Sequence, residues 1–289
     1  MKESLNISYS QNFLHSKGLI SRLIAKSNIR AGDLVIDIGA GKGIISNVLL
    51  YRGCEVIAIE KDAVLAKALP ENLAETIKDR PEAVVKPIQA DFLNFNLKNL
   101  PPFKVFANIP FFLTSAIVRK LCLTDSKLVS AYLVMEAAAA ARIIGKPYHT
   151  ESYLPLILKS QWEMKIRYTF DRFDFIPVPD AEIVLVEFSR QENPVVKKED
   201  FTDYCDFLAF CLNLRKSNVK NSLLDVFTFV QLKKIAIPLK IDLQAPPSTL
   251  TLQQWLGLFQ NFKTRVDAAK KAQIKGSAER LERHRQKQI

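Results

Sequence analysis

A glycine-rich segment after an apolar run near the N-terminus restricts the possible folds more than any other feature. Residues Leu34-Val-Ile-Asp-Ile38 form a β-type run, followed directly by Gly39-Ala-Gly41-Lys-Gly43 and then by an apolar helical pattern from Ile44 to Leu50. A glycine-rich turn between a strand and a helix lets a ligand come close to the backbone. The spacing is GxGxG, which falls short of the dinucleotide pattern GxGxxG. The segment predicts an α/β domain that binds a ligand at the end of its first strand.

Strand-like and helix-like segments continue to alternate after this turn. The further strands are expected at residues 55–60, 83–88, 103–107 and 128–135, and the helices at 63–78 (interrupted near Pro70), 115–121 and 136–144. Residues 162–170 and 182–188 have the pattern of a closing pair of strands. Alternating strands and helices imply βαβ units and a mostly parallel sheet with both faces covered.

A polar break at residues 191–199 marks the expected end of the α/β part. Residues 201–214, 219–229 and 250–262 then have the amphipathic pattern of helices. We therefore expect a catalytic domain at residues 1–192, a small all-α domain at 193–265 and a basic C-terminal tail at 266–289.

The positive charge of the chain is concentrated at its two ends. The formal net charge is +11, and residues 263–289 hold nine Lys or Arg against three Asp or Glu, while the first thirty residues hold five against one. Basic extensions on a globular body fit a polyanion, with nucleic acid the first choice and an anionic membrane the second. The alternative is a solvated tail that only improves solubility.

The composition of the chain argues against a membrane protein, a secreted protein and a zinc site. No apolar run approaches the roughly 18 to 20 residues that span a bilayer, and the N-terminus has no signal-peptide core. The four cysteines form no CxxC pair and have no partnering histidines, which favours reduced, mostly buried thiols over a zinc site. We expect a cytoplasmic monomer that binds neither a metal ion nor a membrane.

Two acidic residues follow the next strands. Glu60 lies 21 residues after Gly39, where a carboxylate can accept both ribose hydroxyls of a nucleoside, although a nicotinamide cofactor also uses an acidic residue there. Asp91 follows the third strand, where its carboxylate can accept a hydrogen bond from an adenine amino group. Gly39, Glu60 and Asp91 together predict an adenosine pocket of the S-adenosylmethionine type. The alternative interpretation is a helix cap at Asp91 and a surface charge at Glu60.

A four-residue motif follows the fourth strand. In Asn108-Ile109-Pro110-Phe111 the amide oxygen and a backbone carbonyl can accept hydrogen bonds from an exocyclic amine, and the ring can stack on the base. Such a sequence also ends many strands as a simple turn. Beside a methyl donor, however, the motif is typical of amino-methyltransferases.

These motifs, with Ser10-Gln-Asn12-Phe-Leu14 before them and Phe175-Ile-Pro-Val-Pro-Asp180 after them, resemble the rRNA adenine N6-dimethyltransferase family. The resemblance runs from about residue 8 to 190 and has a looser counterpart in Thr251-Leu-Gln-Gln-Trp-Leu256. It implies a Rossmann-like S-adenosylmethionine-dependent methyltransferase that acts on rRNA, with the target adenine flipped out of its stack. By resemblance, the cofactor-binding residues are Asn12, Leu14, Gly39, Glu60, Asp91 and Asn108, and the catalytic residues are Asn108, Ile109, Pro110, Phe111 and Phe175.

The resemblance also gives each residue an expected role. Asn12 and Leu14 would hold the methionine end of the cofactor, and Asn108 would bind the adenine N6 together with the carbonyl of Ile109 or Pro110. Phe111 would stack on the target base, and Phe175 would cover its opposite face. Apart from the resemblance, the positive charge near Lys17, Arg22, Arg119 and Lys120, with the helical domain, makes these residues candidates for binding RNA phosphates.

The expected target is an adenine of large-subunit rRNA. The small-subunit branch of the family carries a Gly-Ser-x-x-Tyr-Gly-Arg stretch, and the equivalent Ile144-Gly-Lys-Pro-Tyr-His149 lacks it. The chain therefore resembles the erythromycin-resistance (Erm) branch, which dimethylates one 23S rRNA adenine and blocks macrolide, lincosamide and streptogramin B binding. Three alternatives remain, namely a small-subunit dimethyltransferase, a non-catalytic RNA-binding scaffold and a DNA adenine methyltransferase.

The chain departs from the family pattern in three places. Phe111 replaces the commoner tyrosine, which should leave stacking intact because stacking uses the face of the ring. The segment 135–142 is unusually rich in alanine, and Asp180-Ala-Glu182 replaces a Val-x-Ser sequence. The last two departures concern the positioning of RNA more than the chemistry.

Overall fold

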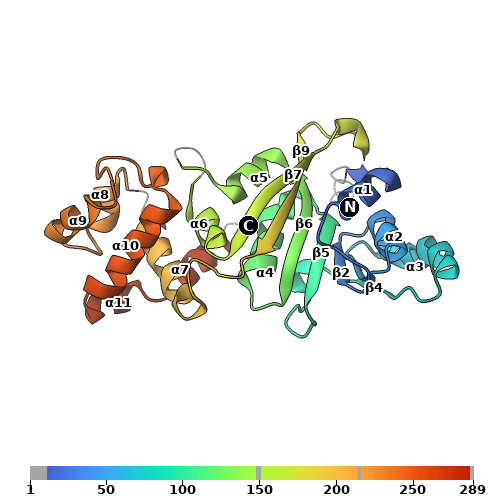
Figure 1. Ribbon diagram of the computed structural model, residues 1–289, viewed down its shortest axis with the longest axis horizontal. Coiled ribbons are helices and arrows are strands. Elements are labelled where there is room, and N and C mark those ends of the chain that lie inside the picture. The colour runs from blue at the N-terminus through green and yellow to red at the C-terminus, as the bar shows by residue number, and fades with distance from the viewer. Residues whose placement is uncertain (1–11, 148–150, 214–215, 287–289) are drawn as a thin grey trace, which may run out of the picture. The chain divides into compact units, whose positions relative to one another are not determined.

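The computed structural model describes residues 12–147, 151–213 and 216–286 (Figure 1). The chain divides into two compact units. The sheet unit comprises Met1–Ala140 and Trp162–Gln191, and the helical unit comprises Ala141–Gln161 and Glu192–Ile289. Residues 141–161, which the sequence analysis assigns to the catalytic domain, thus group with the helical unit. Ser10, Gln11 and His149 lie outside the described residues.

The sheet unit contains a seven-stranded sheet in the order β4-β3-β2-β5-β6-β9-β7. The strands are β2 (Leu34–Ile38), β3 (Glu55–Glu60), β4 (Val85–Gln89), β5 (Phe103–Asn108), β6 (Leu128–Glu136), β7 (Trp162–Thr169) and β9 (Ile183–Arg190). The first five strands are mutually parallel, whereas β9 lies antiparallel between β6 and β7. The expected mostly parallel sheet with a closing pair of strands is confirmed.

The pattern of burial explains why the central strands are apolar on both faces. Nearly every residue of β2, β3, β6 and β9 is buried, as expected for strands covered by helices on each side. The edge strand β4 is less buried and contains Pro87, whose missing N–H is tolerated at an edge.

The helices of this unit are α1 (Lys17–Ala25), α2 (Ile44–Tyr51), α3 (Ala63–Asp79) and α4 (Thr114–Leu123), and α5 (Ala137–Ile144) begins in it. One core cluster joins α1, α2 and α3 to the sheet, with Ile20, Leu49 and Leu69 completely buried. The expected interruption near Pro70 is wrong, because α3 continues through this residue.

A two-stranded ribbon completes the sheet unit. Strand β1 (Phe13–Leu14) pairs antiparallel with β8 (Phe175–Ile176), so that Phe13 faces Ile176 and Leu14 faces Phe175. The ribbon brings the Asn-Phe-Leu motif next to the Phe-Ile-Pro motif, although the two lie about 160 residues apart in the chain.

The helical unit contains α6 (Tyr153–Lys159), α7 (Lys198–Asn213), α8 (Val219–Leu223), α9 (Phe229–Ala236), α10 (Leu252–Arg265), α11 (Ala268–Ile274) and α12 (Ser277–Gln286). Aromatic side chains of α7 and α10 form its core, and the Phe207 ring lies 5.1 Å from that of Phe262. The single helix expected at 219–229 is instead two helices. Thr228 and Gln231 form a capping box that starts α9 at Phe229.

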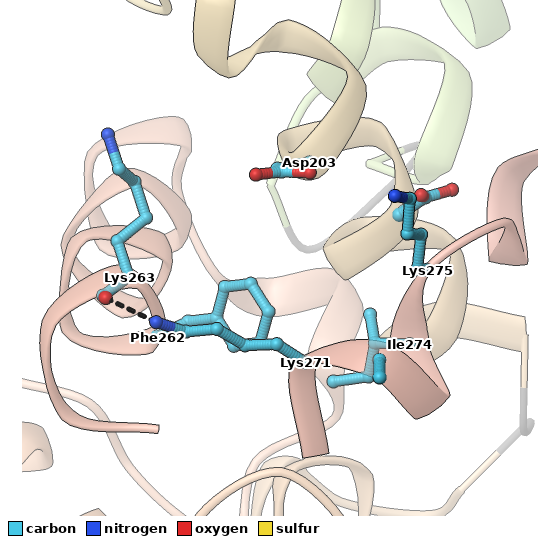
Figure 2. A pocket seen from close by; sticks show the side chains of 8 residues that line it. Asp203, Phe262, Lys263, Lys271, Ile274 and Lys275 are labelled. Atoms are coloured by element: carbon cyan, nitrogen blue, oxygen red, sulfur yellow. Dashed lines mark hydrogen bonds between the residues drawn. The ribbon is translucent and has the colours of Figure 1, made fainter. Parts of the chain in front are cut away.

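The segment expected as a basic tail contains the helices α11 and α12. The buried Asp206 of α7 accepts hydrogen bonds from the backbone N–H groups of Gly276 (2.7 Å) and Ala278 (2.9 Å), which joins the start of α12 to α7. Figure 2 shows a pocket of about 260 Å³ in this unit, where Lys271 donates a hydrogen bond to the Lys263 carbonyl (2.6 Å). Both lysine and aspartate residues line it, so the pocket has no single sign of charge.

Candidate active site

The carboxyl ends of the parallel strands meet at one edge of the sheet. The chain fills one side of the sheet through β2, β3 and β4 and then crosses to β5 on the other side of β2. Ligands of open α/β sheets bind at such a reversal of strand order. Gly39 follows β2 and Asn108 ends β5, so two of the expected site residues flank this point.

The glycine turn and Glu60 form one hydrogen-bonded unit. The N–H groups of Gly39 and Ala40 donate to the Ile59 carbonyl at the end of β3. Gly41 has a φ of 56°, and a Cβ at this position would lie 3.0 Å from the Phe13 ring, so only glycine fits without movement of a neighbour. The buried Glu60 carboxylate accepts the Gly41 N–H (2.8 Å) and the Asp62 N–H (2.9 Å).

A pocket of about 300 Å³ opens at the reversal point. It is lined by Phe13, Leu14, His15, Gly39, Ala40, Lys42, Ile44, Ile45, Asn108 and Ile176. Leu14, Gly39 and Asn108 of the expected site therefore share one cavity. Glu60 ends β3 and Asp91 follows β4, at the same edge of the sheet, but neither residue lines this pocket.

Asn108 has one half of its amide free. Its Nδ2 donates to the Asn12 carbonyl (2.7 Å), which fixes the orientation of the side chain. Its Oδ1 is buried and has no hydrogen-bond partner within the described part of the chain. Leaving a buried acceptor unpaired costs about 1–3 kcal/mol. Such an acceptor, aligned by the opposite end of its own amide, can receive an N–H group from a ligand.

Asn12 holds the two motifs of the ribbon together. Its side chain donates to the Pro177 carbonyl (2.7 Å), while its own carbonyl accepts from Asn108. Leu14 is buried in the wall of the pocket. The Asn12 side chain is thus occupied in the structure, and of the two expected residues only Leu14 lines the pocket.

Asp91 interacts at both of its oxygens. Oδ1 accepts the Leu93 N–H (2.9 Å) and caps the 3-10 helix Phe92–Asn94, and Oδ2 forms an ion pair with Lys61 (2.9 Å). The hydrogen bond from Lys61 lowers the pKa of Asp91, with a smaller contribution from the Leu93 N–H. The cap that the sequence analysis weighed as an alternative is therefore present, and the carboxylate is ionised at neutral pH.

The Asn108-Ile109-Pro110-Phe111 segment leaves β5 in a fixed turn. Ile109 is buried, and the Pro110 carbonyl accepts the Leu113 N–H (2.9 Å) in the 3-10 helix Phe111–Leu113. The Phe111 ring is partly buried against the core cluster. The motif therefore continues into a hydrogen-bonded turn, in which Phe111 follows the buried Ile109 by two residues.

Phe175 lies elsewhere than the sequence analysis expects. Its side chain is completely buried, and its ring packs against that of Phe170 at 5.3 Å. Because neighbouring residues of a strand face opposite sides, the adjacent Ile176 lines the pocket instead. Phe175 has no free face for a base in this structure.

Asp37 and His15 are two polar residues of the site that the sequence analysis did not select. Asp37 is buried on β2, where its Oδ2 accepts the N–H and the hydroxyl of Ser46, and Oδ1 has no partner within the described residues. Burial raises the pKa of Asp37 to about 7, against the lowering effect of the Ser46 hydrogen bonds. His15 lines the pocket, and its Nε2 lies 2.8 Å from the Phe173 carbonyl. A carbonyl can only accept, so Nε2 carries the proton of this bond.

Two features of the described residues bear on other classes of site. Among the described residues, no helix is long and apolar enough to cross a membrane. The same part of the chain contains no group of three or more His, Cys, Asp or Glu side chains that could hold a metal ion.

The sheet order, the glycine turn and the pocket at the strand ends define a Rossmann-like methyltransferase fold. The structure is similar to the crystal structure of the 23S rRNA methyltransferase ErmE (TM-score 0.74, 26% identity, 88% of this chain and 100% of the other). It also shares its fold with a dimethyladenosine transferase from Plasmodium falciparum (TM-score 0.68, 18% identity, 87% of this chain and 97% of the other).

Sequence similarity shows the family to which the chain belongs. Residues 2–264 match the model of the ribosomal RNA adenine dimethylase family. The chain is 30% identical over 270 residues to ribosomal RNA small subunit methyltransferase A of Lactobacillus johnsonii, and the match covers 88% of this chain and 90% of the relative. It is 27% identical over 261 residues to an rRNA adenine N-6-methyltransferase of Bacillus licheniformis, and this match covers 90% of this chain and 88% of the relative. The chain belongs to the ribosomal RNA adenine dimethylase family, whose members are S-adenosylmethionine-dependent enzymes.

Proposed function

We propose that this chain transfers methyl groups from S-adenosylmethionine to N6 of an rRNA adenine, with Asn108 as the residue that grips the amine. The single observation that carries the proposal is the unpaired, buried Oδ1 of Asn108 in the wall of the pocket. An exocyclic NH2 group would give this oxygen the donor that the described residues do not supply. Membership of the family supports an adenine amine as that donor.

The residues around the pocket fit the cofactor. The left-handed backbone at Gly41 keeps the turn open beside Phe13, and the pocket wall is mostly apolar. Glu60, already aligned by two backbone N–H groups, would accept from the ribose hydroxyls, and Asp91 would accept from the adenine amine beside Lys61. Leu14 and the Asn12 backbone would border the methionine end.

When bound, S-adenosylmethionine supplies an electrophilic methyl group on a sulfonium centre. The protein's own contribution is orientation of the adenine amine. The N6 lone pair is delocalised into the ring, and hydrogen bonds from N6–H to fixed acceptors favour a more pyramidal nitrogen. The Pro110 carbonyl already accepts the Leu113 N–H, so we assign the second acceptor to Ile109. Orientation of this kind can supply a large share of the rate.

Phe111 would stack on the target base once it has left the RNA stack, which offsets part of the cost of flipping. Phe175 has no such role in this proposal because it belongs to the core. The helical unit and the basic C-terminal segment would bind RNA phosphates, and the enzyme would work as a monomer.

For the target we propose an adenine of large-subunit rRNA. The similarity to ErmE and the missing Gly-Ser-x-x-Tyr-Gly-Arg stretch support it. Methylation of that kind would give resistance to macrolide, lincosamide and streptogramin B antibiotics. The second candidate is an adenine of small-subunit rRNA, which the similarity to the Lactobacillus johnsonii enzyme favours.

One experiment tests both levels of the proposal. Protein-free 16S and 23S rRNA are incubated separately with the chain and methyl-labelled S-adenosylmethionine, and the modified adenines are mapped by primer extension. Label in 23S rRNA supports the first target, and label in 16S rRNA alone replaces it with the second. No label in either rRNA contradicts methyl transfer itself. Macrolide susceptibility of a host that expresses the gene then tests resistance.

A further inference from the structure

Two exposed phenylalanine rings belong to turns that connect to residues of the pocket wall, Phe112 through Asn108 and Phe173 through His15. Phe112 is 73% exposed and Phe173 is 71% exposed, whereas most aromatic rings of the sheet unit are wholly or partly buried. Ile176, which lines the pocket, is 61% exposed and follows Phe173 by three residues in the chain. Large apolar side chains that stay exposed on segments adjoining a pocket point to a site of interaction.

The backbone under Phe112 is fixed. Phe112 lies within the 3-10 helix Phe111–Leu113, four residues after Asn108. The Leu113 N–H donates to the Pro110 carbonyl (2.9 Å), and the Thr114 hydroxyl donates to the Phe111 carbonyl (2.7 Å). The exposed ring thus extends from a turn that is held on both sides.

The backbone under Phe173 is fixed in the same way. It lies in the 3-10 helix Arg172–Asp174, whose capping box joins Asp171 and Asp174. The Phe173 N–H donates to the Asp171 carboxylate (2.9 Å), and the Phe173 carbonyl accepts from His15 (2.8 Å). Because His15 lines the pocket with Asn108, this hydrogen bond connects the Phe173 turn to the pocket wall.

Basic residues of the pocket wall and of the adjoining segments fit a polyanion. Lys42 lines the pocket, Lys17 begins α1 two residues after His15, and Arg172 precedes Phe173. The nearby carboxylates of Asp171 and Asp174 are engaged in the capping box. Exposed rings beside basic side chains are the combination that binds unpaired nucleotides, because every base has a face that can stack.

We propose that Phe112 and Phe173 stack on the unpaired nucleotides next to the target adenine and hold the RNA open at the pocket. The inference rests on the proposed function. When the adenine leaves its stack, its neighbours lose a stacking partner. A ring on a rigid turn offers each neighbour a replacement at a low cost in conformational entropy. Phe111 grips the target base itself, so the two exposed rings are separate from it.

The test is a kinetic comparison of ring variants on protein-free rRNA that the wild type methylates. Phe112→Ala and Phe173→Ala should each raise the KM for RNA roughly tenfold, with little change in kcat or in the KM for S-adenosylmethionine. Phe112→Tyr and Phe173→Tyr keep a ring and should restore the wild-type KM. Ile166→Ala, which removes an exposed apolar side chain from the edge strand β7, is the matched control and should change nothing.

A second readout separates stacking from general loss of binding. An RNA oligonucleotide around the mapped adenine carries 2-aminopurine at the neighbouring position, and its fluorescence should be quenched by the wild type and remain bright with Phe112→Ala or Phe173→Ala. Unchanged KM and quenching in the alanine variants overturn the inference while the methyl transfer of the wild type still supports the proposed function. Absence of transfer by the wild type overturns both.

Discussion

At the scale of single residues, Asn108 is the side chain to which the proposal assigns the binding of the adenine amine. Asn108→Ala should abolish methyl transfer, because the alanine has no acceptor for the adenine amine. Cofactor affinity should stay nearly unchanged, since the Glu60 and glycine-turn contacts remain. Labelled-methyl transfer and calorimetric binding of S-adenosylmethionine measure the two effects. A loss of cofactor affinity with the transfer activity retained would contradict the assigned role.

Phe111 gives a second prediction at this scale. Phe111→Ala should lower activity far more than Phe111→Tyr, because the tyrosine keeps the face of the ring. The Phe111 side chain also packs against the core cluster, so the melting temperature of each variant is needed beside its kcat/KM. Equal activities of two folded variants would argue against stacking.

Asp37 predicts a pH dependence of stability. Burial raises its pKa to about 7 in the folded protein, while in the unfolded chain an aspartate titrates near pH 4. The unfolded state therefore releases this proton first, and the contribution of Asp37 to stability, complete below about pH 4, is lost as the pH rises to about 7. Asp37→Asn should flatten the urea-unfolding free energy between these pH values. An unchanged slope would show that Asp37 is ionised in the fold.

At the scale of helices and strands, Asp206 joins two helices that lie about 70 residues apart in the chain. Asp206→Ala removes the acceptor for two backbone N–H groups at the start of α12 and should lower the free energy of unfolding by about 1–3 kcal/mol. Faster proteolysis within residues 268–286 should accompany the loss. Asp203→Ala, an exposed change on the same helix, is the matched control, and equal effects of the two would refute the capping role.

The sequence predicts the elements whose signals are local. The strand-turn-helix of Leu34 to Leu50 needs only apolar runs and three glycines, and the structure confirms it. The helix expected at Val219 to Phe229 is wrong, because α8 ends at Leu223 and the Thr228–Gln231 capping box, readable in the sequence, starts a new helix at Phe229. The burial of Phe175 had no such signal, since the pairing of β8 with β1 decides which way its ring faces. The docking of residues 266–286 likewise depends on Asp206, a partner distant in sequence.

At the scale of the whole molecule, the net charge of +11 governs the encounter with RNA. The affinity for rRNA should fall steeply and linearly on a plot of log Kd against log salt concentration, because each phosphate contact releases counterions. Fluorescence anisotropy with labelled rRNA fragments at several salt concentrations measures the slope. A flat dependence would mean that the basic ends of the chain do not contact phosphates.

The hydrogen bond between Asn12 and Pro177 also determines how late during synthesis the binding site can form. It joins residues 165 positions apart, and both Asn108 and the β1–β8 ribbon depend on the Asn12 backbone that it secures. At about 5–20 residues per second, translation needs roughly 8–33 s to extend from one partner to the other. A nascent chain that ends before Pro177 therefore lacks one wall of its pocket. The enzyme acquires its binding site only after most of the sheet unit has been synthesised.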